Sequence, residues 1–354
     1  MTAVNTTSVS NHRKLAPSRK RRAGAEAYAL VAVWIVIILV FSFVKPDTFP
    51  TAANLSSMLG SQAVLLILAL GLVIPLRVGD YDLSVASSLN LSAMLVAILN
   101  TQHHWGVGYA ALAGVLAAAL VGVTNGLIIV RFNIDPFIVT LGVSTVVQGL
   151  IYLISGSSTI TGISSSLSNA VLHQPFWSIP VDFYYAIGLC VVLWYVFDYT
   201  PFGQRLLFLG QNRDMARLNG IGIGRLRVTA LIASATIAGV AGVVFAGTTS
   251  SSDPVSGQGF LLPAFAACFL GSTTLKVGRF NPWGTTIAVY FLVTGITGLQ
   301  LLGAQQYVQQ LFYGGALVIA VVASTLVKSR SDRQRQSSTE GDLAAAGPPA
   351  VPKD

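Results

Sequence analysis

The sequence is short of charge. Lys, Arg, Asp and Glu make up 10% of its 354 residues, whereas hydrophobic residues make up 53%. A water-soluble domain carries about 25% charged residues, which cover its hydrated surface. This composition therefore argues against an ordinary soluble globular protein and predicts that most of the chain lies in lipid.

Signals for common protein chemistry are also missing. The two cysteines, Cys190 and Cys268, lie inside hydrophobic runs and do not indicate a disulfide framework or a metal site. The sequence contains no Gly-Lys dipeptide, so it has no phosphate-binding P-loop, and no H-E-x-x-H zinc motif occurs. We therefore expect no catalytic residues, no metal site and no cofactor, ATP included, in this chain.

What the sequence does contain is long apolar runs. Crossing ~30 Å of hydrocarbon takes roughly 20 apolar residues as a helix, and inside lipid the backbone must satisfy its own hydrogen bonds. The runs predict an all-α fold, a polytopic transmembrane helical bundle of about ten spans in two related halves. We place the spans near 27–45, 58–76, 83–100, 109–130, 136–154, 181–198, 226–247, 260–272, 283–302 and 307–327.

Two of these spans depart from a simple crossing. The eighth run is short and is followed by Gly271, so we expect a broken or re-entrant helix there. Pro75 is expected to end the second span early, because proline cannot donate the helical hydrogen bond.

The positions of Lys and Arg predict the topology. With the N-terminus inside, Lys45 is the one residue of the 21 Lys and Arg that falls outside the inner segments and the adjoining edge of the seventh span. Basic residues concentrate on the cytoplasmic side of membrane proteins, so both termini are predicted to be cytoplasmic and nucleic acid is not expected as a partner. The inner segments are 1–26, 77–82, 131–135, 199–225, 273–282 and 328–354; the first is a basic tail, 27–327 is the transmembrane domain, and the last is predicted to be disordered.

Polar side chains form stripes on two predicted helices. Residues four apart share a helix face. The stripes fit hydrogen bonding between helices, or a hydrated path for a neutral, hydroxyl-rich solute, and both interpretations stay open. The stripe residues are Ser84, Ser88, Asn90 and Ser92 in the third span, and Thr140, Ser144 and Gln148 in the fifth.

Charged residues gather where the second span joins the third. Ionisable residues at membrane depth are costly and are candidates for function. Asp82 fits either an N-cap of the third helix or a gating residue of the path. Arg77 is expected to pair with Asp80 at the inner interface. No chain of acidic residues crosses the membrane, which argues against a proton-coupled pump.

Several stretches, in order along the chain, resemble the permeases of ribose-type ABC importers. Residues 79–87 read G-D-Y-D-L-S-V-A-S where the family has G-G-I-D-L-S-V-G-S, so Asp80 and Ala86 depart. N-G-L at 125–127 and P-F-I-V-T-L-G at 136–142 are similar to the family's N-G-L and P-P-F-I-V-T-L-G. T-P-F-G-Q-R at 200–205, G-Q-N-R at 210–213, A-R-L-N-G-I at 216–221 and G-S-T-T-L at 271–275 also resemble family segments.

The resemblance implies an ABC importer permease for a sugar or polyol in the bacterial inner membrane. It implies two cytoplasmic ATPase subunits that bind ATP, an extracytoplasmic solute-binding protein, and a second permease subunit, which form a complex in the lipid bilayer. Loop 199–225 is then the ATPase-coupling loop, with a short helix near 212–218 that carries Arg213 and Arg217 on one face. Its candidate residues are Pro201, Phe202, Gly203, Arg205, Gly210, Asn212, Arg213, Ala216, Arg217 and Gly220.

Two other classes of protein remain as alternatives. A secondary active transporter of a small polar solute also has repeats and broken helices. A membrane-embedded enzyme would need a nucleophile–base pair or metal ligands, and the sequence presents neither pattern. Pentose, hexose and sugar alcohol all remain open as the solute, as does the choice between a homodimer and a heterodimer.

Overall fold

A computed structural model describes residues 27–325, which are mostly helical, as predicted. Residues 1–26 and 326–354, which include both predicted tails, lie outside the described residues. One antiparallel pair of short strands, β1 (Ile160–Thr161) and β2 (Ser251–Ser252), is present in the described part. The helices are α2 (Ala29–Val44), α3 (Ala52–Ser61), α4 (Ala63–Arg77), α5 (Val85–Thr101), α6 (Val107–Phe132), α7 (Pro136–Ser155), α8 (Ser165–Leu172), α9 (Val181–Tyr199), α10 (Pro201–Gln211), α11 (Arg213–Leu218), α12 (Ile223–Thr249), the 3-10 helix η1 (Ser256–Phe260), α13 (Leu261–Gly271), α14 (Pro282–Leu301) and a final helix, Gln306–Thr325.

Polar caps fix where several helices begin. The side chains of Asp135, Thr200 and Asn281 each accept a backbone N–H from the first turn of α7, α10 and α14. A proline follows each of these caps at the first helical position, where no N–H is needed. The local sequence therefore determines where α7, α10 and α14 start.

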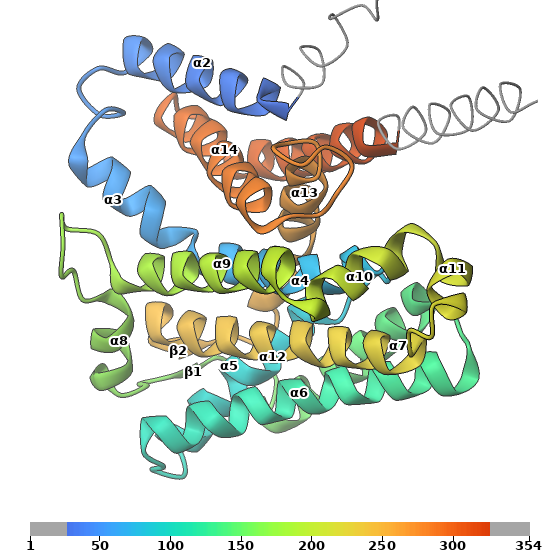
Figure 1. Cartoon of the computed structure of the whole chain (residues 1–354). Helices are drawn as coiled ribbons and strands as arrows, with labels where there is room; N and C mark the ends of the chain where they lie inside the picture. The colour runs from blue at the N-terminus through green and yellow to red at the C-terminus, as the bar shows by residue number, and fades with distance from the viewer. Residues whose placement is uncertain (1–26, 326–354) are drawn as a thin grey trace, which may run out of the picture.

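Helix α4 is the centre of the molecule. Every residue from Ala63 to Arg77 is buried, and α4 contacts α9, α12, α13 and α14 (Figure 1). By contrast, α2 has no buried residue, and the helix Gln306–Thr325 is mostly exposed although it is apolar. Apolar side chains that face outward in this way are suited to contact with lipid.

Small residues let α12 approach its neighbours closely. A Cβ added at Gly242 would overlap the carbonyl oxygen of Leu89 on α5. One added at Gly122 on α6 would lie 2.7 Å from the carbonyl oxygen of Leu231 on α12. Close backbone contact of this kind stabilises helix pairs in lipid, where the hydrophobic effect does not drive them together. Figure 1 shows α6 and α12 lying side by side along much of their length.

The predicted count of about ten spans is not confirmed. Within residues 27–325, six helices are long and apolar enough to cross a membrane, and a seventh span is possible if α3 and α4, bent by 41°, count as one. The shorter apolar helices are Ala29–Val44, Val85–Thr101 and Ser256–Gly271, the last at the predicted short eighth span. The expectation for Pro75 is wrong, because α4 continues through it to Arg77.

Candidate functional site

The link between α4 and α5 places charged residues inside the protein. Gly79 adopts φ 81°, a left-handed conformation that favours glycine, and turns the chain after α4. The side chains of Asp80 and Asp82, which follow it, are both fully buried. Buried carboxylates require partners, and these partners come from distant parts of the sequence.

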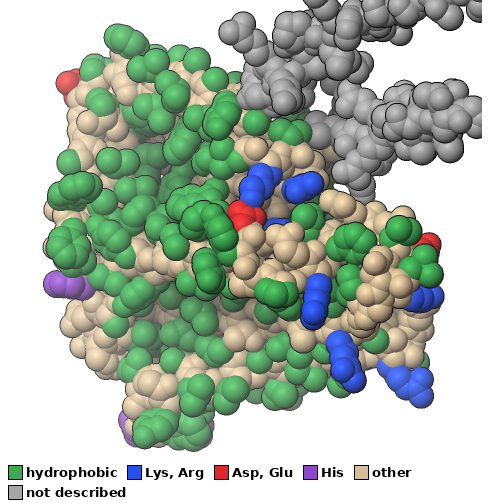
Figure 2. Space-filling view, viewed as in Figure 1, with side chains coloured by type: hydrophobic (Ala, Val, Ile, Leu, Met, Phe, Trp, Pro, Cys, Tyr) green, Lys and Arg blue, Asp and Glu red, His purple; other side chains and the backbone are tan. Residues whose placement is uncertain are grey.

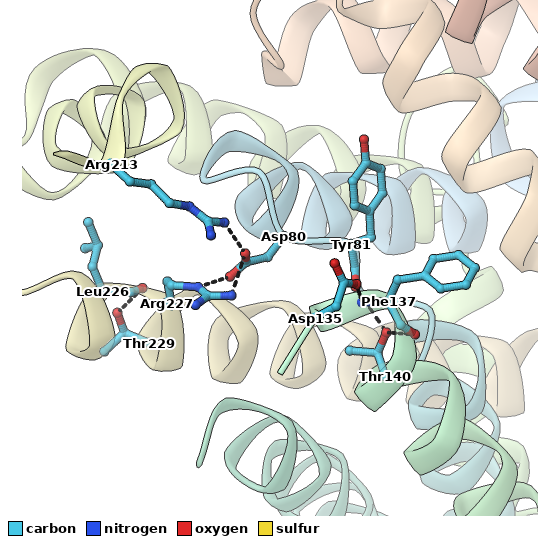
Figure 3. Close-up of polar contacts among 9 residues, drawn as sticks. All are labelled: Asp80, Tyr81, Asp135, Phe137, Thr140, Arg213, Leu226, Arg227 and Thr229. Carbon is cyan, nitrogen blue, oxygen red and sulfur yellow. Dashed lines mark hydrogen bonds and ion pairs between the residues drawn. The ribbon is translucent and has the colours of Figure 1, made fainter. Parts of the chain in front are cut away.

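Asp80 is held by two arginines (Figure 3). Arg227 on α12 donates to both of its oxygens, with Nε 2.7 Å from Oδ2 and a terminal nitrogen 2.9 Å from Oδ1. Arg213, the first residue of α11, donates to Oδ1 at 2.9 Å. Arg227 is buried whereas the Arg213 side chain is 49% exposed. The expected pairing of Asp80 with Arg77 is therefore wrong; Arg77 instead lies over the ring of Phe197.

Asp82 is satisfied by hydroxyl and amide groups. Its Oδ1 accepts the backbone N–H and the hydroxyl of Ser84, and its Oδ2 accepts the hydroxyl of Ser234 on α12 at 3.1 Å. Asn125 on α6 donates its amide to the Ser84 hydroxyl at 2.7 Å. The N-cap position that the sequence analysis offered to Asp82 is occupied by Ser84. Asp82 holds Ser84 and joins the start of α5 to α12 through Ser234, whereas Ser84 joins it to α6 through Asn125.

The stripe on α7 makes fixed contacts at both of its ends. Thr140 donates its hydroxyl to the carbonyl of Tyr81 at 3.1 Å (Figure 3). It also accepts the N–H of Leu83 at 3.1 Å. Gln148 donates to the carbonyl of Pro254 at 2.7 Å. Ser144, between them, is half-buried. Two of the three stripe residues therefore hold α7 against neighbouring segments.

The polar stripe on α5 also contains residues that form fixed hydrogen bonds and a residue that does not. Asn90 donates to the carbonyl of Pro254, as Gln148 does, and Ser92 donates to the carbonyl of Gly239 on α12 at 2.8 Å. Ser88 is fully buried, and neither its hydroxyl nor Oδ1 of Asn90 has a partner among the described residues. The stripe therefore holds α5 against neighbouring segments, but the Ser88 hydroxyl and Oδ1 of Asn90 remain without hydrogen-bond partners among the described residues.

The loop beyond β2 has an acidic residue with strong local hydrogen bonding. Asp253 accepts the backbone N–H of Val255 at 2.9 Å and the hydroxyl of Thr159 at 2.8 Å. The N–H of Val255 is the main cause of a pKa for Asp253 below its usual range, because hydrogen bonds to the charged form stabilise it. The same loop carries Pro254, the acceptor for Asn90 and Gln148.

Segment 199–225 contains the predicted short helix, α11, which begins after Asn212, and it also contains the helix α10, which the sequence analysis did not predict. The Asn212 side chain accepts the backbone N–H groups of Asp214 and Met215. Ala216 is the buried residue of α11, so the helix projects from the bundle with Arg217 exposed. Pro201, Arg205 and Gly220 are also exposed, and Phe202 is half-buried.

Two glycines of this loop have a packing role. A Cβ at Gly203 would overlap the carbonyl oxygen of Val196, and a Cβ at Gly210 would overlap the carbonyl oxygen of Arg77 at the end of α4. Leu206 and Leu209 on the same helix are fully buried. Helix α10 is therefore fixed tightly to the core, and α11 extends from a rigid base.

Sequence reasoning missed the partners of the acidic residues. The candidate residues did not include Arg227, which contacts Asp80, or Ser234, which contacts Asp82. They also did not include Asn125, which contacts Ser84 beside Asp82. The position of Arg227 at the edge of an apolar run was a usable signal, since a cation there needs an anion nearby.

Comparison with known proteins gives the family. A family model described as "Branched-chain amino acid transport system / permease component" matches residues 54–321. The chain belongs to this permease family. The permease is 30% identical to the L-arabinose ABC transporter permease protein of Azospirillum brasilense over 328 residues, 89% of this chain and 93% of that protein. It is 31% identical to the ribose import permease protein of Bacillus subtilis (81% and 89% covered) and 27% identical to the D-allose transport system permease protein of Escherichia coli (85% and 92%).

These relatives confirm the resemblance to sugar ABC permeases that was inferred from the sequence motifs. With its apolar helices, the permease is a multi-pass membrane protein. No solved structure matches the permease.

Proposed function

We propose that this permease is the membrane subunit of an ABC importer for a sugar or polyol. An extracytoplasmic binding protein delivers the solute, two ATPase subunits on the cytoplasmic side bind ATP, and a second permease subunit completes the path. The names of the relatives support the sugar class, since the three described above are permeases for L-arabinose, ribose and D-allose. Loop 199–225, with exposed Arg217 on a projecting helix, supports contact with an ATPase.

The polar groups of α5 support a neutral, hydroxyl-rich solute. The hydroxyl of Ser88 and Oδ1 of Asn90 are buried without partners among residues 27–325. Unpartnered buried polar groups are costly, so a nearby hydroxyl of a solute in transit would satisfy them. Such groups bind by directional hydrogen bonds and do not trap a sugar with a full charge.

The observation that carries the proposal is the ion pair between Asp80 and Arg213. It connects the exposed helix α11 with Asp80, a buried residue of segment 78–84, and this segment leads directly into α5. When an ATPase closes and moves α11, Arg213 would draw Asp80 with it, and the start of α5 would follow as part of a rigid element. Arg213 is therefore a positioning residue, and Arg227 is the fixed anchor of Asp80 in α12.

The central test is energy coupling. Proteoliposomes that contain the permease, its ATPase and its binding protein should accumulate radiolabelled L-arabinose, D-ribose or D-allose only when ATP is supplied. Uptake by the permease without the ATPase, or uptake that collapses with the ion gradient while ATP is maintained, would contradict the proposal and favour a secondary transporter.

The ion pair has a separate test. Arg213→Gln should leave the permease folded, since Arg227 still neutralises Asp80, but should reduce sugar uptake per ATP hydrolysed several-fold. Arg217→Glu should instead weaken binding of the ATPase, because Arg217 is exposed and makes no ion pair in the described part of the chain. Arg131→Gln, an exposed cation on α6, is the matched control and should behave as wild type. A wild-type ratio of uptake to hydrolysis in Arg213→Gln would refute the positioning role.

A further inference from the structure

A second polar feature lies apart from Asp80, in a pocket of about 370 Å³ where the end of α4 meets the α9–α10 corner and the α13–α14 loop. Its volume lies within the ~300–1,000 Å³ typical of small-molecule sites. The residues that line it are Arg77, Asp198, Tyr199, Gln204, Leu207, Lys276, Arg279 and Phe280. None of these side chains contributes to the contacts of Asp80 or Asp82. We refer to it as the corner pocket.

The corner pocket has an excess of positive charge. Lys276 pairs with Asp198 at 2.5 Å, which neutralises one cation with the one acidic residue of the lining. Arg279 is exposed and has no carboxylate within 4.0 Å in the described part of the chain, and Arg77 is the third cation. Figure 2 shows basic side chains grouped around an acidic one on this face of the molecule. Two positive charges thus remain without a counter-charge from the lining.

Arg77 is buried but forms no ion pair within the described part of the chain. Arg77 is 8% exposed, and its Nε has no hydrogen-bond partner among residues 27–325. Its one polar contact in that range is with the carbonyl of Phe197, at 3.4 Å from a terminal nitrogen. A guanidinium stays charged at all physiological pH values, and burying it without an anion is costly. An anion in the corner pocket would remove this cost.

Aromatic residues indicate the depth of the corner pocket. Trp194, Tyr195 and Tyr199 cluster near the end of α9, with ring centroids 5.4 and 5.6 Å from that of Tyr199. Tyr195 and Tyr199 are more than half exposed, and Tyr199 also lines the pocket. Tyr and Trp gather at the level of lipid headgroups. The corner pocket therefore opens at headgroup depth, on the side where the basic loops lie.

We propose that the corner pocket binds a phosphate group, with Arg77 at its base and Arg279 and Lys276 at its mouth. Arginine side chains bind phosphate by paired hydrogen bonds, and basic pockets between helices on the cytoplasmic side bind anionic headgroups. The phosphodiester of an anionic phospholipid fits the depth of the pocket; a soluble phosphate ester shares its chemistry. This inference does not depend on the identity of the transported solute.

The experiment uses the full-length permease in phosphatidylcholine nanodiscs and in detergent. Phosphatidylglycerol, glycerol 3-phosphate and inorganic phosphate are titrated separately, with the thermal midpoint and lipid retention in native mass spectra as readouts. Phosphatidylglycerol should raise the midpoint and stay bound, and the double variant Lys276→Gln/Arg279→Gln should weaken this binding at least tenfold. Arg279→Gln alone, which leaves the Lys276–Asp198 pair intact, should weaken it by a smaller factor.

The control removes two exposed cations elsewhere, by Arg131→Gln and Arg225→Gln, and should bind as wild type. Binding of phosphatidylglycerol alone assigns the phosphate to a lipid, and equal binding of glycerol 3-phosphate assigns it to a soluble ester. If no phosphate compound binds, or if the control pair weakens binding as much as the Lys276–Arg279 pair, the proposal is refuted.

Discussion

Gly210 lies where α10 crosses the end of α4, and any side chain there would overlap the carbonyl oxygen of Arg77. Because backbone atoms cannot move aside as a flexible side chain can, Gly210→Ala should cost about 1–3 kcal/mol of stability. We expect a lower thermal midpoint in detergent and less ATP-driven uptake, as α10 is displaced. Gly188→Ala on α9 is the control, since a Cβ there meets no atom within 4 Å. A wild-type midpoint for Gly210→Ala would contradict this packing.

At the level of single residues, the sequence identified Asp82 and Ser84 but not their environment. Their motif is local, and Ser84 does lie beside Asp82. The other partners of Asp80 and Asp82 are 133 to 152 positions away in the chain, so no spacing rule could find them. Arg77 was the nearest cation to Asp80 in sequence, but the geometry of the turn at Gly79 directs the two side chains to different neighbours.

At the level of elements, the β1–β2 pair and the loop that follows it depend on one carboxylate. Asp253 accepts hydrogen bonds from Thr159, which precedes β1, and from Val255, which follows β2. The N–H of Val255 is the main cause of its lowered pKa. A carboxyl whose pKa is lower in the folded state stabilises the protein above its unfolded pKa of about 3.9, and this contribution is lost as the pH falls through the folded value.

We therefore expect Asp253→Asn to unfold at a slightly lower temperature than wild type at pH 7, because the charged acceptor is missing. The two proteins should begin to converge as the pH drops below about 4, and they should match once the pH lies below the lowered pKa of folded wild type, where its carboxyl is also neutral. Thermal unfolding of both proteins between pH 3 and pH 7 checks this. A difference that is independent of pH would show that the charge of Asp253 does not matter.

The positions of the helices could be predicted far better than their lengths. Each predicted apolar run coincides with a helix, because runs of this kind have no other structure available in lipid. The short length of α13 was expected from the short eighth run, but the break between α3 and α4 at Gln62 was not foreseen. This break depends on packing against other helices, and the hydropathy of a run carries no information about its neighbours.

At the level of the whole molecule, the orientation in the membrane is a prediction from Lys and Arg positions alone. Single cysteines at Leu218 (81% exposed) and Trp177 (91% exposed) would test it, since Cys190 and Cys268 are fully buried and should not react. A membrane-impermeant maleimide should label Trp177→Cys in intact cells and Leu218→Cys only after the membrane is opened. The reverse pattern would place α11 outside and exclude contact with a cytoplasmic ATPase.

The contacts of Asp80 also limit how this permease can be recombined with its relatives. The carboxylate belongs to segment 78–84, whereas its two arginines belong to a region more than 130 residues later. Consider a chimera that keeps segment 78–84 and receives the region of Arg213 and Arg227 from another permease. If the donor lacks these two arginines, the buried carboxylate of Asp80 has no positively charged partner. Hybrid importers built on this chain should therefore exchange both regions together.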